Sequence, residues 1–135
     1  FHDTTSVSGG ALHVMMVLAM AATYDPDPTA PKGVRLPVDL RTSVLDQEAW
    51  SRWLRHDPVR ILEEEQAQAG LASLRGLYID CGARDQYFIH YGSRQLSDRL
   101  NELGIEHRYD EFDGTHSGIN HRMDESLPFL YEALS

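Results

Sequence analysis

An aspartate and a histidine near the C-terminus each follow a strand-like run, and together they could move a proton. Asp85 comes shortly after the apolar run Leu77 to Cys81. His116 comes shortly after Ile105 to Phe112, where apolar and charged residues alternate. One amphipathic helical pattern, Tyr87 to Leu103, lies between them. A carboxylate that orients an imidazole makes a general base that can activate a hydroxyl nucleophile. The order of residues therefore predicts an acid–base pair.

Two neighbouring parallel strands must position this pair. A strand that reaches the next strand through one helix runs parallel to it, with a right-handed crossover. The helix pattern stops at Gly104, a residue suited to the left-handed turn after a helix. Ligands in such sheets sit beyond the C-terminal ends of the strands, where Asp85 and His116 both fall. The alternative is that Asp85 only caps the next helix and that His116 is an ordinary turn residue.

No residue of the sequence has the pattern of the matching nucleophile. The G-x-S-x-G motif of a strand-to-helix nucleophile elbow does not occur among the 135 residues. Ser8 has glycines on one side only, and Ser117 is adjacent to His116 in the same loop. Cys81 ends an apolar run, where a cysteine is usually a buried filler, and no histidine near in sequence could activate it. We therefore expect the nucleophile upstream of residue 1.

A metal site is the competing interpretation of the histidines. One stretch is rich in ligand-type side chains: His107, Asp110, Glu111, Asp113, His116 and His121. The stretch has no H-E-x-x-H motif and no paired cysteines, and His107 falls within the expected strand. We therefore expect scattered solvated side chains, with no metal and no cofactor.

Composition excludes some partners. The net charge of −9, from 12 basic and 21 acidic residues, argues against nucleic acid, whose binding needs clustered Lys and Arg. The longest apolar stretch, Ala11 to Ala22, falls short of the roughly 20 residues that cross a bilayer, so no membrane span is expected. A single cysteine, Cys81, cannot form an internal disulfide and leaves the compartment open.

The N-terminal half is expected to be mainly helical. Phe1 to Gly10 is typical of a loop. Ala11 to Tyr24 predicts a helix that is apolar nearly all round, hence buried or covered by a segment outside the chain. Two proline-containing stretches, Asp25 to Pro28 and Pro31 to Gly33, predict an extended connector.

A pair of further helices follows this connector. Asp46 is the expected N-cap of a helix that carries Trp50 and Trp53 on one face. A second helix begins at Pro58 and presents the acidic run 63–65 to solvent. The tryptophans are most simply core residues, but in a cap over the site they could wall an acyl or alcohol pocket.

The last helix and the domain division complete the expected fold. The helix carries Leu127 to Leu134, with Ser126 as its cap and Pro128 in its first turn. Two parallel strands cannot bury both faces, so the rest of the sheet must lie outside the chain. We therefore expect a helical cap and connector over 1–73 and a strand-helix-strand-helix α/β core over 74–135.

Three motifs of the core resemble a known family. They are Cys81-Gly82-Ala83-Arg84-Asp85-Gln86-Tyr87, His90-Tyr91-Gly92-Ser93-Arg94 and Glu111-Phe112-Asp113-Gly114-Thr115-His116-Ser117. On these motifs the chain is similar to the C-terminal segment of the esterase D-like family of α/β-hydrolases. A weaker similarity runs through Ala19-Met20-Ala21-Ala22, Leu36-Pro37-Val38-Asp39 and Trp50-Ser51-Arg52-Trp53-Leu54. The resemblance implies an α/β-hydrolase fold and a serine carboxylesterase, with Asp85 as triad acid and His116 as triad base.

The resemblance also implies partners. The substrate would be a small-molecule ester. The nucleophilic serine and the oxyanion hole would come from the N-terminal remainder of the same protein or from a partner chain, so this chain alone would be inactive. Association of identical chains would be another way to cover its apolar surfaces. Two alternatives stay open: a non-catalytic α/β binding module, and an acyltransferase of the same fold.

Overall fold

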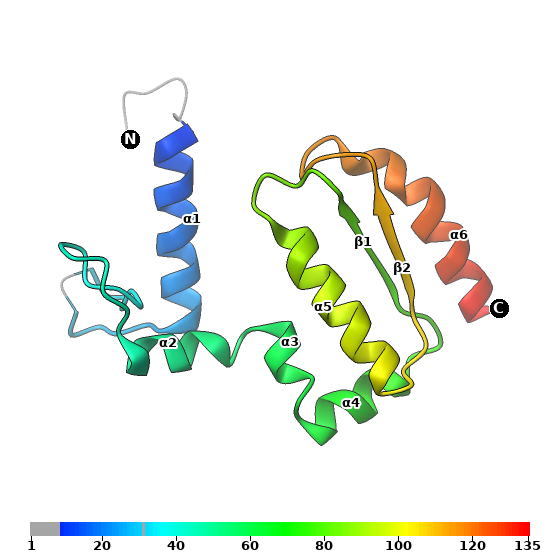
Figure 1. The fold of residues 1–135 in the computed structure, drawn as a ribbon, viewed down its shortest axis with the longest axis horizontal. Coiled ribbons are helices and arrows are strands. Elements are labelled where there is room, and N and C mark those ends of the chain that lie inside the picture. The colour runs from blue at the N-terminus through cyan, green and yellow to red at the C-terminus, as the bar shows by residue number, and fades with distance from the viewer. Residues whose placement is uncertain (1–8, 31) are drawn as a thin grey trace. The chain divides into compact units, whose positions relative to one another are not determined.

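The computed structural model describes residues 9–30 and 32–135. The chain divides into two compact units, one up to Asp57 and one from Pro58 to Ser135 (Figure 1). Each unit is described by itself. The structure divides the chain at Asp57, earlier than the boundary expected after residue 73, because the helices between residues 58 and 73 belong to the second unit.

An apolar helix opens the first unit. Helix α1 spans Gly9–Tyr24, so Gly9 and Gly10 are helical where a loop is expected, and the rest of that expected loop lies outside the described residues. Ala21 is the buried residue of this helix. Most of its large apolar side chains are exposed: Leu12, Val14, Met15, Met16, Val17 and Met20. The described residues of the first unit therefore do not bury this helix. That a segment outside the chain covers its apolar side chains stays a prediction.

Helix α2, Gln47–Leu54, is capped as its sequence predicts. The Oδ1 atom of Asp46 accepts hydrogen bonds from the backbone N–H groups of Glu48 and Ala49, both at 3.0 Å. Trp53 is buried and meets the ring of Tyr24 edge-on, whereas Trp50 is exposed. The expected tryptophan face is thus split between core and surface. The connector before α2 holds two isolated antiparallel bridges, Pro26 with Val34 and Val38 with Leu45.

The second unit begins with two short helices where the sequence predicts one. Helix α3 spans Pro58–Ile61 and helix α4 spans Glu65–Ala72. Leu62 lies in the turn between them and is almost fully buried. It forms the core of the unit with Leu100 and Ile105. The helix expected from the sequence is therefore interrupted at the buried Leu62, and the acidic residues that follow remain exposed as expected.

A two-stranded parallel sheet forms the centre of the second unit. Strand β1, Tyr78–Gly82, pairs with strand β2, Arg108–Phe112, in parallel register. Helix α5, Ile89–Glu102, connects them and lies on one side of the sheet, while α6, Met123–Leu134, lies on the other (Figure 1). The expected parallel α/β arrangement is confirmed. Among the helices of the described residues, none has the length and apolar character needed to span a bilayer.

The ends of two helices test the local predictions. Gly104 follows α5 with a φ of +67°, as expected for its position. The last helix begins at Met123 rather than after Ser126, because a 3-10 turn, η1 (Ile119–Arg122), leads directly into it. Pro128 therefore lies inside α6, and Ser126 is not its cap. A proline this near the N-terminus removes a single helical hydrogen bond.

Candidate active site

The Asp85 side chain is buried in the turn that joins β1 to α5. The backbone N–H of Asp85 donates to the carbonyl of Gly82 at 3.0 Å, and its own carbonyl accepts from Phe88 at 3.1 Å. The Oδ1 atom accepts from the backbone N–H of Tyr87 at 2.8 Å. One carboxylate oxygen is therefore used to fix the turn, which leaves Oδ2 for another partner.

That partner is His116. Its Nδ1 atom lies 2.9 Å from Oδ2 of Asp85. Only 2% of the Asp85 side chain is exposed, against 48% of the imidazole. The hydrogen bond expected between the two residues is confirmed. Because Nδ1 faces the carboxylate, Nε2 lies on the opposite side of a ring that is half open to solvent.

Two neighbours that the sequence did not single out hold His116 in place. The Oε1 atom of Gln86 accepts from the backbone N–H of His116 at 3.2 Å. The ring of Tyr87 meets the imidazole edge-on, with centroids 4.9 Å apart. Both residues directly follow Asp85, so their place beside the acid was the one available signal. The turn after β1 thus orients His116 through three successive residues, Asp85, Gln86 and Tyr87.

The loop after β1, which carries Asp85 (the acid loop), and the loop after β2, which carries His116 (the histidine loop), are held together by backbone hydrogen bonds. The N–H of Ala83 donates to the carbonyl of Phe112 at 2.8 Å, and that of Arg84 donates to Gly114 at 2.9 Å. A Cβ atom on Gly82 would lie 2.6 Å from the carbonyl oxygen of Gly114. The two loops can therefore pair only because residue 82 has no side chain.

Gly82→Ala is expected to destabilise the protein by about 1–3 kcal/mol, because its new methyl group would push the two loops apart. Gly92→Ala is the matched control. A Cβ at Gly92 meets nothing within 4 Å, and alanine inside α5 is expected to add up to about 1 kcal/mol. Urea unfolding of both variants beside the wild type makes the comparison. Undiminished stability of Gly82→Ala would contradict the tight pairing.

Opposing effects set the charge of Asp85. Burial raises the pKa of the carboxyl, but hydrogen bonds from the His116 ring and from the Tyr87 and Ile89 backbone outweigh it and lower the pKa below its usual value of 3.8. At neutral pH the group is therefore a carboxylate, the form that accepts a hydrogen bond from the Nδ1–H group and stabilises an imidazolium.

The lowered pKa predicts a pH dependence of stability. A carboxyl whose pKa falls on folding contributes stability that is present above its unfolded pKa and lost as pH falls through the folded one. The contribution of Asp85 should therefore be complete above about pH 4 and disappear in stronger acid. Unfolding free energies of wild type and Asp85→Asn, measured from pH 2 to pH 7, check this. A constant difference over that range would contradict the assignment.

A small cavity of about 120 Å³ adjoins the pair. Ile89, Phe112 and Ile119 give it apolar walls beside Asp85 and His116. A larger cavity, of about 630 Å³, lies instead by Gly76, Leu77 and the segment before β2. That is the N-terminal end of both strands. Because open α/β sheets bind ligands at the other end, the smaller cavity marks the candidate site.

The structure describes two of the three other nucleophile candidates. Ser8 lies outside the described residues. Ser117 is exposed, and its backbone N–H donates to Oγ1 of Thr115 at 3.3 Å. Cys81 is buried below the site with its Sγ atom 4.0 Å from Oδ2 of Asp85. Burial raises the pKa of the Cys81 thiol, which disfavours the nucleophilic thiolate.

The three histidines of the ligand-rich stretch have separate partners. The Nε2 atom of His107 lies 2.7 Å from Oγ of Ser97, and its Nδ1 atom lies 3.0 Å from the carbonyl oxygen of Ile105. His121 is bonded through Nδ1 to the carbonyl of Gly118 at 3.0 Å. Over residues 9–30 and 32–135, no group of three or more His, Cys, Asp or Glu side chains could hold a metal ion.

Comparison with known proteins adds no family to this geometry. No family model matches the chain, and no curated protein matches it. The esterase resemblance of the motifs stays a prediction, and the case for a catalytic site rests on the Asp85–His116 arrangement.

Proposed function

We propose that the chain supplies the acid and the base of a serine ester hydrolase of the α/β-hydrolase class. One observation carries the proposal: the buried Asp85 carboxylate binds Nδ1 of His116 at 2.9 Å, while the imidazole remains half exposed. An ionised carboxylate on Nδ1 fixes the tautomer in which Nε2 carries the free lone pair. A histidine held this way is ready to accept a proton from a nucleophile on its open side.

The reaction then follows from the two residues. Nε2 of His116 takes the proton of a serine hydroxyl as the oxygen attacks the ester carbonyl, and Asp85 stabilises the resulting imidazolium. His116 returns that proton to the departing alkoxide. It then takes a proton from water, whose oxygen attacks the acyl-serine, and it gives this proton to the serine oxygen as the acid departs. The serine and the N–H groups that stabilise the oxyanion would lie on a segment outside these 135 residues.

Labelling with a fluorophosphonate tests the proposal on the protein that contains this chain. Such a probe phosphonylates a serine only when a base activates it. We expect labelling of the wild type at one serine, and labelling at least about a hundredfold slower in His116→Ala, since the loss of a general base costs about 10²–10⁴ in rate. Equal labelling of wild type and variant would reject the acid–base role of this pair.

A further inference from the structure

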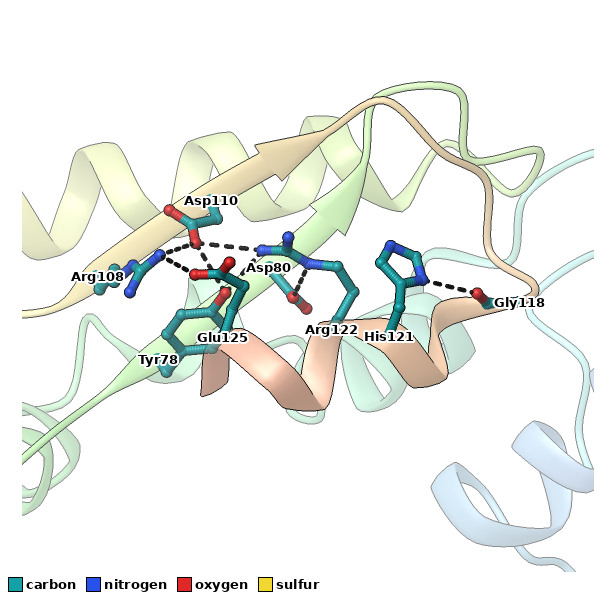
Figure 2. A network of polar contacts seen from close by, with 8 residues as sticks. All are labelled: Tyr78, Asp80, Arg108, Asp110, Gly118, His121, Arg122 and Glu125. Carbon is teal, nitrogen blue, oxygen red and sulfur yellow. Dashed lines mark hydrogen bonds and ion pairs between the residues drawn. The ribbon is translucent and has the colours of Figure 1, made fainter. Parts of the chain in front are cut away.

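A second polar cluster ties the histidine loop to the sheet. The guanidinium of Arg122, at the end of η1, donates from Nε to Asp80 at 2.9 Å. Its Nη2 group donates to the hydroxyl of Tyr78 at 2.8 Å and to Asp110 at 3.2 Å. Figure 2 shows this side chain reaching from the helix to both strands. One side chain thus binds β1 and β2 together.

The two acids explain why a cation is needed there. Asp80 of β1 and Asp110 of β2 are register partners on adjacent strands. Like charges in neighbouring positions of a sheet repel one another. Arg108 compensates Asp110 at 2.7 Å and also reaches Glu125 at 3.0 Å. Within residues 9–30 and 32–135, Asp80 makes one ion pair, with Arg122, whose side chain is only 15% exposed.

Tyr78 links the two acidic strands in the same cluster. Burial, together with a hydrogen bond to Asp110, raises the pKa of Tyr78 to about 12. Its hydroxyl therefore stays protonated, donating to Asp110 at 2.8 Å and accepting from Arg122. The arginine consequently meets a fixed set of acceptors, which determines where the end of η1 must lie.

The position of Arg122 matters because the histidine loop closes around the ring of Phe112. The Arg122 guanidinium lies over that ring, 4.8 Å from its centre, and the His121 ring meets it edge-on. Gly114 packs so closely against the same ring that a Cβ there would lie 2.3 Å from it. In the sequence, His116 lies between Gly114 and Arg122, so both ends of its segment contact Phe112.

We propose that Arg122 is a positioning residue, which holds the loop from β2 to α6 in the arc that brings His116 to Asp85. The inference rests on the proposed function and extends it to a residue remote from the reacting atoms. The start of the loop is fixed by backbone bonds to the acid loop, and its end is fixed by Arg122. Without the Arg122 contacts, the segment that carries His116 would be held only at its start, by the backbone bonds to the acid loop. The distance between His116 and Asp85 would then no longer be fixed.

Arg122→Gln and Arg122→Lys test this role in the protein that contains the chain. We expect Arg122→Gln to lower kcat for p-nitrophenyl acetate about ten- to a hundredfold with little change in KM, because a misplaced base slows chemistry more than binding. Arg122→Lys should lose less, since an ammonium keeps the charge but not the forked geometry. Arg108→Gln, which alters the same cluster outside the loop, should leave kcat within about threefold of the wild type.

A second variant separates positioning from folding. Asp80→Asn combined with Arg122→Gln removes one charge of each sign and should recover stability while kcat stays low. Recovery of kcat together with stability would show that Arg122 serves only the balance of charge. A loss of kcat in Arg108→Gln as large as in Arg122→Gln would overturn the proposal in the same way.

A readout without catalysis distinguishes this inference from the proposed function. Carbon-13 NMR titration of the Asp85 carboxyl should show a higher pKa in Arg122→Gln than in the wild type or Arg108→Gln, because the His116 hydrogen bond that lowers it is weakened. This rise in a protein without esterase activity would support positioning and reject the function. An unchanged pKa in an active esterase would reject positioning alone.

Discussion

Replacing His116 by alanine in the protein that contains this chain is expected to lower kcat for ester hydrolysis by about 10⁴- to 10⁶-fold, as for the loss of a triad histidine. The imidazole handles the proton of the nucleophile and that of the leaving group, and no other described histidine lies against Asp85. Stopped-flow or long-time assays with p-nitrophenyl acetate measure the ratio. Thermal unfolding should shift to lower temperature, since the variant leaves the buried Asp85 carboxylate without its His116 partner, so kcat is compared at a temperature at which both proteins are folded.

The other two histidines of the C-terminal half provide the control. His107→Ala and His121→Ala are expected to reduce kcat far less, because these rings bond to Ser97 and to the Gly118 carbonyl instead of the acid. Similar losses at His107, His116 and His121, with wild-type activity lost to a chelator and restored by zinc, would reject the serine mechanism in favour of a metal site.

Asp85→Asn is expected to lower kcat by about 10⁴-fold, the loss that the same change causes in a serine protease triad. Asparagine fills the same volume but can present its amide N–H to Nδ1, which favours the tautomer with the proton on Nε2. The imidazole then cannot accept a proton from the nucleophile, and no carboxylate stabilises the imidazolium. Binding of substrate does not depend on this tautomer, so KM should change little.

A conservative variant of the same residue serves as its control. Asp85→Glu keeps the charge but moves it by one methylene group in a buried turn, and it should retain more activity than Asp85→Asn at equal or lower stability. Measuring kcat beside urea unfolding separates the two effects. Asp85→Asn with more than a tenth of wild-type kcat would show that the hydrogen bond to His116 is structural only.

Local chemistry in the sequence was enough to predict most of the elements and their order. The Asp46 cap, the turn at Gly104 and the alternation before Phe112 each depend on a few neighbouring residues, so they predict α2, the end of α5 and β2 without long-range information. The same order placed Asp85 and His116 after adjacent parallel strands. It could not give their distance, because that depends on how two loops pack.

Contacts between distant residues decided the rest. Arg122 binds Asp80, 42 residues away, and no local pattern announces such a partner. Leu62 is buried with Leu100 of α5 and lies between two helices where the sequence predicts one, and the chain divides at Asp57. The 2.9 Å contact of His116 with Asp85 requires the missing side chain at Gly82 and a loop fixed at both ends. Sequence alone determined which groups could do chemistry, whereas packing between distant segments set the geometry in which they could do it.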